Sequence, residues 1–351
     1  MKPTRLHAWF VAMCLIWGAT WIAVKIGIGT VPPVFFAGTR FTVAGIIMLV
    51  MARWQGGAGR IARADLPRLA AVTLLMISAT YALLFWGAQF VSSGLAAILD
   101  LALLPVAMLA IAALLGEERF SRVRAAGVAL GVAGLLLLFG PQALRGGQPE
   151  QGEAGTLMWY LGGGAIVLSA LLYSLGSVLA RPLLRAYPLG LVSGATTAAG
   201  GAVLLAGALA LEPGAVAALS GRWGAAAWGS WAFLVLCGSL VAYTAYLRLV
   251  REWGASRAGS YAFVSPIIAV LLGVLVFGET VTGTDALGMA VMLAGAWITL
   301  RPAGEAAPSR ARPPALDGIR PAGSAGASRA GAFPLRACPA AEGGEQGRAL
   351  D

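Results

Sequence analysis

Charge is scarce in this chain, and histidine and cysteine are scarcer still. Of 351 residues, 11% are charged, one is a histidine (His7) and three are cysteines (Cys14, Cys237 and Cys338). Three scattered cysteines are too few for a disulfide framework, and one histidine at the extreme N-terminus excludes a histidine-rich metal site. The chain also lacks a G-x-x-x-x-G-K-[ST] loop, so no ATP-binding motif is present.

Apolar residues take the place of the missing charge. The chain is 59% hydrophobic and its mean hydropathy is +0.81. One soluble core stops growing well before this length, so a soluble fold could not bury so much apolar surface. Apolar runs of about 20 residues, each able to cross a bilayer core of about 30 Å, recur along the chain. The composition therefore predicts an all-α polytopic membrane protein whose main partner is the lipid bilayer.

Turn residues and charges divide the apolar sequence into ten predicted transmembrane helices. The expected spans are 6–28, 33–52, 69–89, 92–115, 121–140, 158–180, 189–211, 226–248, 257–278 and 282–300. From Arg301 onward, Pro, Ala, Gly and Arg dominate without periodicity. Such a composition predicts a disordered tail over residues 302–351.

A spaced motif occurs twice in the chain and indicates an internal duplication. Its spacing is P-x12-E-x2-[ST]-x5-G-x6-G, and the two copies are 161 positions apart. The copies comprise Pro105, Glu118, Ser121, Gly127 and Gly134, and then Pro266, Glu279, Thr282, Gly288 and Gly295. A weaker repeat, at an offset of 156, matches Pro32, Gly38 and Gly45 with Pro188, Gly194 and Gly201.

The distribution of Lys and Arg predicts how the two halves are inserted. With the N-terminus in the cytoplasm, the inner connections hold 14 basic residues and the outer ones two, leaving out the tail. Five spans per half then place the second half upside down relative to the first. The prediction is an inverted 5+5 repeat with both termini cytoplasmic. The first repeat is expected over residues 1–145 and the second over residues 155–301.

These features together resemble the EamA-type transporters of the drug/metabolite transporter superfamily. The resemblance rests on Trp17-Gly18-Ala19, on Arg40 and on the Pro…Glu…Gly…Gly block that closes each half. It implies a ten-helix secondary carrier of the inner cell membrane that moves metabolites, amino acids or toxic organic compounds, mostly outward. It also implies a central cavity between the halves, lined by helices one, three, four, six, eight and nine. Leu175-Gly176-Ser177 stands where a second Trp-Gly would be expected, and Asp100 departs from the family pattern.

Three ionisable residues lie clearly within the predicted spans. Lys25 is close enough to a helix end to reach the interface. Arg40 and Asp100 lie about 10–12 Å deep from the same face, at about 1.5 Å per residue. One hypothesis is a structural ion pair of Asp100 with Arg40 or Lys25; the other is a carboxylate that faces the cavity and binds a proton or a cationic group.

Aromatic residues in the spans are candidates for solute contacts, although packing and interfacial roles are commoner for this residue type. The predicted substrate-binding residues are Trp17, Trp21, Arg40, Tyr81, Trp86, Asp100, Tyr173, Tyr243 and Tyr246. Two mid-span prolines, Pro105 and Pro266, are candidate hinges or fixed bends. Glu118 and Glu279 are expected at helix ends, where they support the next helix rather than carry protons.

The residues in the spans include no catalytic cluster, so an enzyme is not expected, and neither is a metal or another cofactor. The sequence predicts export of small organic solutes by alternating access. Facilitative import of metabolites, a membrane scaffold and a lipid-handling protein stay open as alternatives. Coupling to protons and a monomeric or homodimeric state also stay open. The net charge of +10 reflects the cytoplasmic face and not a nucleic-acid partner.

Overall fold

The described part of the chain is helical throughout and contains no strand. The computed structural model describes residues 3–55, 59–91, 93–146, 153–277 and 281–301. The first repeat contains α1 (Pro3–Ile28), α2 (Pro33–Trp54), η1 (Arg63–Asp65), α3 (Leu66–Thr73), η2 (Leu74–Ala79), α4 (Thr80–Gly87), α5 (Ser93–Leu114) and α6 (Arg122–Gly146). The second contains α7 (Glu153–Ala186), α8 (Leu189–Leu211), α9 (Ala215–Ala218), α10 (Ala225–Phe233), η3 (Leu234–Tyr243), α11 (Thr244–Trp253), α12 (Ala255–Ala258), α13 (Tyr261–Phe277) and α14 (Gly283–Leu300).

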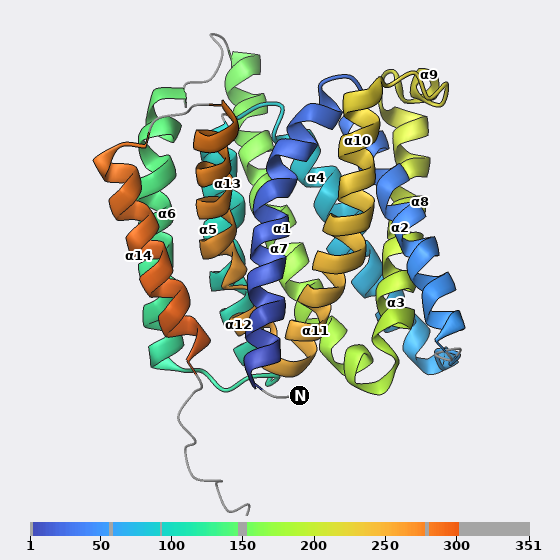
Figure 1. Cartoon of the computed structure of the whole chain (residues 1–351), viewed down its shortest axis with the longest axis horizontal. Helices are drawn as coiled ribbons and strands as arrows, with labels where there is room; N and C mark the ends of the chain where they lie inside the picture. Colours follow the sequence, from blue (N-terminus) through green and yellow to red (C-terminus); the bar gives the residue numbers. More distant parts are fainter. Residues whose placement is uncertain (1–2, 56–58, 92, 147–152, 278–280, 302–351) are drawn as a thin grey trace, which may run out of the picture. The chain divides into compact units, whose positions relative to one another are not determined.

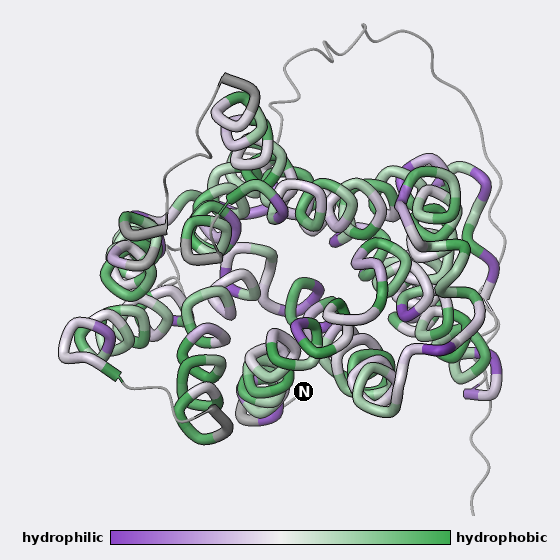
Figure 2. Tube along the Cα trace, turned by 90° about the horizontal axis from the view of Figure 1, so that it is seen from above, coloured by the Kyte–Doolittle hydropathy of each residue, from purple (hydrophilic) through white to green (hydrophobic). Residues whose placement is uncertain are grey.

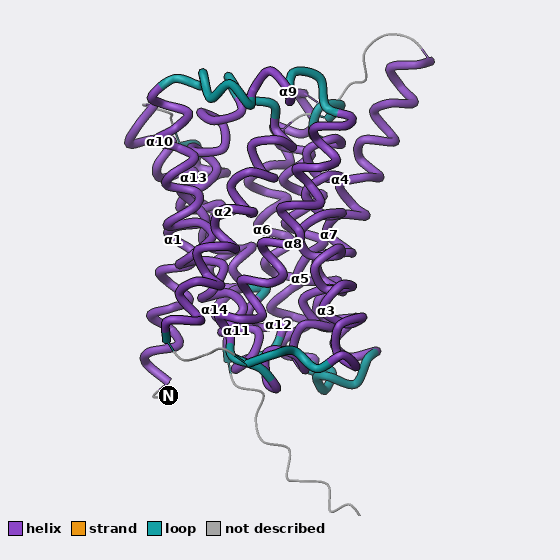
Figure 3. Tube along the Cα trace, turned by 90° about the vertical axis from the view of Figure 1, so that its right-hand side faces the viewer, coloured by secondary structure: helices purple, strands orange, loops and turns teal. Residues whose placement is uncertain are grey.

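Ten stretches of the described helices are long and apolar enough to cross a bilayer, which confirms the predicted number. The third span begins at Arg63, and the sixth runs over 155–186, so both are longer than expected. Figure 3 shows the connecting loops at the two ends of the helices. Figure 2 shows that apolar residues predominate along the helices. The predicted tail over residues 302–351 lies outside the described residues, and so does Glu279 of the second copy of the repeated motif.

The helices gather into two lobes with α1 and α7 between them (Figure 1). We call the group of α2, α3, η2, α4, α8, α10, η3 and α11 the first lobe. The group of α5, α6, α13 and α14 is the second lobe. Each lobe therefore combines helices from both repeats. The resemblance implied a cavity between the two sequence halves. The cavity instead lies between two lobes, each of which contains helices from both repeats.

The repeated glycines are the points at which repeat-related helices cross. In the second lobe, a Cβ on Gly127 would lie 2.9 Å from Thr299 N, and one on Gly134 would lie 2.7 Å from Met292 N. The contacts advance along α6 as they recede along α14, so this pair is antiparallel. In the first lobe, Gly38 of α2 packs against Leu205 of α8 in the same manner. Antiparallel pairing of repeat-related helices is the geometry of an inverted repeat.

Hydroxyl caps begin the helices that follow the repeated motif. Thr282 caps α14 by accepting a hydrogen bond from Asp285 N at 3.2 Å, and Asp285 Oδ2 accepts one from Thr282 N at 2.9 Å. Ser121 Oγ accepts a longer bond from Arg124 N, at 3.4 Å, before α6. Such caps satisfy backbone N–H groups that a helix leaves unpaired. The matched Ser and Thr of the motif are therefore helix starts.

Two helices of the first lobe change to π-helical winding at matching places in the two repeats. η2 interrupts the third span and η3 interrupts the eighth. At the repeat offset of 161, Leu74 and Ala79 correspond to Val235 and Leu240, both within η3. Short π-helical segments occur often at functional sites, because they change which side chains a helix presents. Here η3 lines the cavity described next, and η2 ends directly before Thr80, which also lines it.

Candidate functional site: a cavity between the lobes

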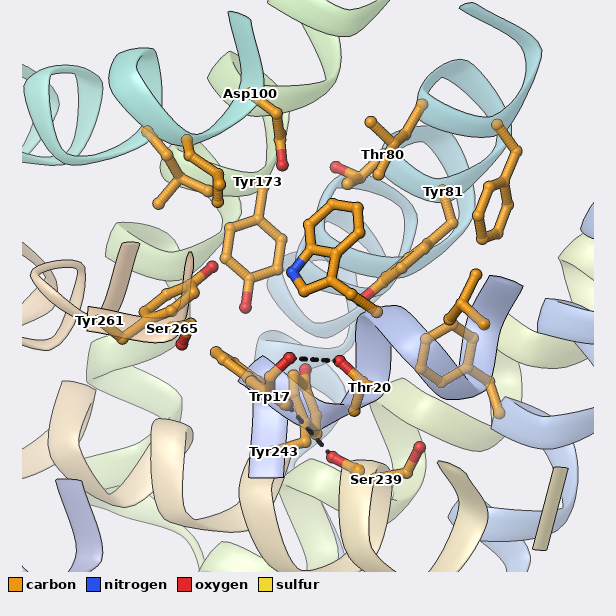
Figure 4. Close-up of a pocket in the computed structure, with 18 of the residues that line it drawn as sticks. Trp17, Thr20, Thr80, Tyr81, Asp100, Tyr173, Ser239, Tyr243, Tyr261 and Ser265 are labelled. Atoms are coloured by element: carbon orange, nitrogen blue, oxygen red, sulfur yellow. Dashed lines mark hydrogen bonds between the residues drawn. The ribbon is translucent and has the colours of Figure 1, made fainter. Parts of the chain in front are cut away.

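A cavity of about 150 Å³ lies between the two lobes and α1. A polar cavity of about 10–15 Å³ already has room for one water, so this cavity is large enough for a small organic solute. Its lining comes from α1, α2, α4, α5, α7, η3 and α13 (Figure 4). The lining residues are Trp17, Thr20, Trp21, Val24, Arg40, Phe41, Thr80, Tyr81, Leu84, Phe85, Asp100, Leu101, Leu104, Tyr173, Gly238, Ser239, Tyr243, Tyr261 and Ser265.

Seven of the nine residues predicted to bind substrate line this cavity, and Trp86 and Tyr246 do not. Trp86 is five residues beyond Tyr81, about 140° further around the helix, and is 40% exposed. Tyr246 shares the face of Tyr243 but lies one turn deeper, where it is fully buried. Direct binding by the seven lining residues stays a prediction.

Several lining residues were missed as individual binding candidates, and the repeat could have identified one of them. Tyr261 stands at the 161 offset from Asp100, so the two are equivalent positions of the two repeats. Trp17 of the first span and Tyr173 of the sixth, the corresponding span of the second repeat, also both line the cavity. A cavity close to the pseudo-symmetry axis is lined by repeat-related pairs, so one member of a pair indicates the other.

Trp17 connects three of the elements that surround the cavity. Its indole Nε1 donates a hydrogen bond to Gly238 O of η3 at 3.3 Å. Its ring lies edge-on to Tyr261 of α13, with centroids 4.5 Å apart, and 5.3 Å from the ring of Tyr246. Thr20, one turn further along α1, donates to Trp17 O at 2.6 Å. The indole is therefore held in place before any solute binds, as a preformed site requires.

Arg40 brings a buried cation to the cavity. The side chain is 7% exposed, and its guanidinium carbon lies 4.3 Å from the Phe41 ring centroid and 5.7 Å from that of Tyr81. No hydrogen bond or ion pair from Arg40 to another described residue is present, and its Nε is fully buried without a partner. Aromatic faces stabilise a guanidinium but leave its N–H groups available for an anion.

Asp100 brings the only carboxylate among the lining residues. Figure 4 shows its carboxylate pointing into the space between Thr80 and Tyr173. The described residues supply it with neither a hydrogen bond nor an ion pair, so the predicted ion pair of Asp100 with Arg40 or Lys25 is not formed. Arg40 belongs to the first lobe and Asp100 to the second, and they contribute separately to the cavity walls. Tyr243 and Ser265 add two further buried hydroxyl side chains to the lining.

Buried side chains close the cavity on the side nearer the N-terminus. Tyr246 OH donates to Ser177 Oγ of α7 at 2.7 Å and lies 3.9 Å from Met108 Sδ of α5. Its ring contacts those of Tyr173 and Tyr261, with centroids 5.7 Å away in each case. Tyr246 and Met108 are both fully buried. We call Tyr246, Ser177 and Met108 the floor of the cavity, since they join the two lobes and α7 beneath it.

A second set of contacts lies at the N-terminal end, below the floor. Glu118, in the connection between α5 and α6, accepts from Ser256 N at 3.2 Å and pairs with Arg124 at 2.9 Å. Arg181 of α7 donates to Glu117 O at 2.8 Å. The prediction that Glu118 supports a helix end is therefore too narrow, because Glu118 also joins the two repeats through Ser256. Pro105 and Pro266 lie inside α5 and α13, and their role as hinges stays a prediction.

An inverted repeat of apolar helices around a preformed, aromatic-lined cavity defines a membrane transporter. The chain belongs to the EamA-like transporter family, whose family model matches residues 5–140 and 160–301. The protein is therefore a multi-pass membrane transporter.

Several curated proteins are similar to this chain. "Uncharacterized inner membrane transporter YedA" of Escherichia coli is 31% identical over 285 residues, covering 80% of this chain and 86% of YedA. A chloroplastic WAT1-related protein of Arabidopsis thaliana is 27% identical over 300 residues, with 82% and 67% covered. One crystal structure superimposes with a TM-score of 0.66 over 84% of this chain and 97% of its own, at 19% identity. That likeness concerns the fold alone.

Proposed function

We propose that this protein exports small organic solutes across the inner membrane by alternating access of the cavity between its two lobes. The observation that carries the proposal is the cavity itself, which has a sealed floor on one side and aromatic walls supplied by both lobes. The inner membrane is supported by the similarity to YedA. Outward transport is supported by the resemblance of the repeated motif to exporters.

The asymmetry of the cavity supports an outward-facing state. Its α1 residues, Trp17 to Val24, lie in the half of that helix farther from the N-terminus. Tyr246, on the N-terminal side of the cavity, is fully buried, whereas Trp21, in the far half of α1, is 45% exposed. The excess of Arg at the N-terminal end supports a cytoplasmic location for that end. In this orientation the floor closes the cavity against the cytoplasm.

Alternating access then requires the floor to open while the opposite end closes. The contacts that must rearrange toward the cytoplasm include the Tyr246–Ser177 hydrogen bond and the contacts of Glu118 and Arg181. They also include the apolar core in which Met108 of α5 is buried together with residues of α11 and α12. The close helix contacts at the repeated glycines hold the helices of each lobe together, and this favours motion of each lobe as a unit.

The lining favours small amphipathic or aromatic solutes. Flux through proteoliposomes tests the proposal, with a panel of labelled amino acids, aromatic amines and aromatic carboxylates measured with and without a pH gradient. We expect saturable transport of at least one compound. Trp17→Ala should reduce that flux at least tenfold, because Trp17 forms one wall and holds η3. The matched control is Trp297→Ala, on α14 at 61% exposure, and it should leave flux unchanged.

The result that refutes the proposal is an absence of saturable flux for every compound on the panel while the protein is monodisperse. Equal flux in Trp17→Ala and Trp297→Ala would refute the role of this cavity. Net flux only from the outer to the cytoplasmic face of oriented proteoliposomes, down the solute gradient, would refute export and support facilitative import instead. A flux that responds to the pH gradient in the wild type but not in Asp100→Asn would assign proton coupling to the cavity carboxylate.

A further inference from the structure

The connection between α5 and α6 carries exposed apolar side chains and arginines together. Figure 1 shows it at the end of the bundle that also holds the N-terminus. Leu115, Phe120 and Val123 are 51%, 64% and 55% exposed, and the exposed Arg119 and Arg122 lie among them along the chain. Exposing such large apolar side chains to water is unfavourable. This mixture is typical of a segment at the membrane interface, where apolar side chains enter the acyl region and arginines reach the headgroups.

The internal repeat does not require these arginines. At the 161 offset, Arg122 and Arg124 correspond to Gly283 and Asp285. A hydroxyl begins the following helix in both copies, so helix capping does not explain the basic residues of the first copy. The bias of Lys and Arg toward one side of a membrane explains why they lie at this end. It does not explain why they gather around one loop.

Helix α7 brings two more arginines to the same loop. Arg181 NH1 donates to Glu117 O at 2.8 Å, and Arg124 NH1 of α6 lies 2.9 Å from Glu118 Oε2. Because Glu117 and Glu118 are neighbours in the chain, the guanidinium groups of α6 and α7 meet at one place. The charges of Arg124 and Arg185 both act on Arg181, and Arg185 is exposed.

Positive charge is in excess at this place. We define the basic cluster as Arg119, Arg122, Arg124, Arg181 and Arg185. The carboxylates in contact with it are those of Glu117 and Glu118, and the buried Nε atoms of Arg124 and Arg181 have no hydrogen-bond partner among the described residues. Guanidinium groups bind phosphate oxygens through several N–H groups at once. The surplus of donors and of charge therefore suits a phosphate group.

We propose that the basic cluster and the exposed apolar residues beside it together bind one anionic phospholipid. The lipid belongs to the leaflet at this end of the bundle, which is the cytoplasmic leaflet in the proposed orientation. Its phosphate lies among the arginines of α6 and α7, and its acyl chains lie against Phe120 and Val123. Basic pockets between transmembrane helices bind anionic headgroups in this manner. The site is separate from the cavity between the lobes, so this inference does not depend on the proposed transport function.

Titration of the purified full chain with dioctanoyl phosphatidylglycerol in a neutral detergent tests the site. The readout is the apparent Tm, because a ligand that binds the folded state raises Tm as its concentration rises. We expect a saturable rise. Dioctanoyl phosphatidylcholine, whose headgroup carries its own cation, should raise Tm less at the same concentration. Glycerol 3-phosphate and inorganic phosphate, which lack acyl chains, should leave Tm unchanged.

Two pairs of substitutions separate this site from a general attraction of basic residues to anionic lipid. Arg122→Gln with Arg185→Gln removes two exposed members of the cluster and should raise the apparent Kd for phosphatidylglycerol at least about tenfold. Arg53→Gln with Arg60→Gln, at the end of α2 and after it, removes the same charge from exposed positions at the same end of the bundle and should leave Kd unchanged. Phe120→Ser should weaken lipid binding without removing charge.

Native mass spectrometry of the same samples gives a second measurement. Phosphatidylglycerol should stay bound to the wild type and to the Arg53/Arg60 pair, and it should be lost from the Arg122/Arg185 pair. The inference is overturned if phosphatidylcholine binds as tightly, if both pairs weaken binding equally, or if the wild type shows neither a Tm rise nor a bound lipid. Inorganic phosphate that raises Tm with the same dependence on Arg122 and Arg185 would show a free-anion site and overturn the choice of a lipid.

Discussion

The glycine crossings predict that two identical substitutions on one helix will have opposite effects. A Cβ on Gly201 of α8 would meet the backbone of Thr42 and lie 2.7 Å from Phe41 C, whereas one on Gly207 would meet nothing within 4 Å. Ordinary contacts of this kind begin at 3.4 Å, so Gly201→Ala requires α2 and α8 to separate by roughly 0.7 Å or more. The backbone atoms of α2 cannot move away from the added methyl group as the end of a flexible side chain could.

The magnitude follows from overpacking and helix propensity. Overpacking a close contact costs about 1–3 kcal/mol, and replacing an open helical glycine by alanine stabilises by about 0.5–1 kcal/mol. Gly201→Ala should therefore destabilise the protein by about 1–2 kcal/mol, and Gly207→Ala should be neutral or stabilising. At about 2–4 °C per kcal/mol, the apparent Tm of the two variants should differ by roughly 3–10 °C.

Thermal unfolding in detergent, followed by light scattering or tryptophan fluorescence, measures this difference. Gly201→Ala should also reduce transport, because the displaced segment of α2 includes Arg40 and Phe41. Equal apparent Tm values for Gly201→Ala and Gly207→Ala would refute the assignment of the repeated glycines as crossing points of the repeats.

Three further predictions concern the ends and the floor of the bundle. In a cysteine-free background, an impermeant thiol reagent added outside cells should label Ser220→Cys, between α9 and α10, and spare Ala62→Cys, before η1; the reverse pattern would invert the proposed orientation. Tyr246→Phe removes the hydrogen bond to Ser177, so it should cost about 0.5–1.5 kcal/mol of stability and make a cysteine placed at Met108 more reactive from the cytoplasmic side; unchanged reactivity would contradict the floor. Glu118→Gln weakens both the ion pair with Arg124 and the hydrogen bond from Ser256 N, so it should lower the free energy of unfolding by about 1–3 kcal/mol. The control is Glu252→Gln, whose partner Arg251 is 39% exposed, and it should change Tm little. Equal effects of the two variants would contradict the joining role of Glu118.

Much of the fold could be predicted from the sequence because a bilayer restricts the choices. Span number follows from apolar length, and inversion follows from Arg counts with an odd number of spans per half. The mixing of the repeats into two lobes could not be predicted, because it depends on which helices cross. Gly127 and Gly288 indicate close helix crossings, but the sequence does not show which helix packs against each of them.

Residues of the candidate site could be predicted where it was enough to know that a residue lies within a span. They could not be predicted where the depth of the residue in the membrane or local π-helical winding decides which way it faces. Arg40 and Asp100 were predicted as ionisable residues within spans, and Trp17 and Tyr81 as aromatic residues of spans expected near the cavity; all four line it. Tyr246 lies three residues, about 4.5 Å, beyond Tyr243, and at that depth it belongs to the floor of the cavity and not to its wall. Spacing rules for an α-helix also fail across η2 and η3, where a π-helical segment turns the following residues to a new face.

The mixed composition of the lobes has a consequence for how the chain can be divided. The first lobe takes α2 from one repeat and α8 from the other, and the second lobe takes α6 and α14 in the same way. Residues 1–145 or 155–301 alone would therefore leave every glycine crossing without its partner helix. Each repeat is a unit of sequence but not a unit of folding, and two half-chains made separately would have to find each other in the membrane before either could form a lobe.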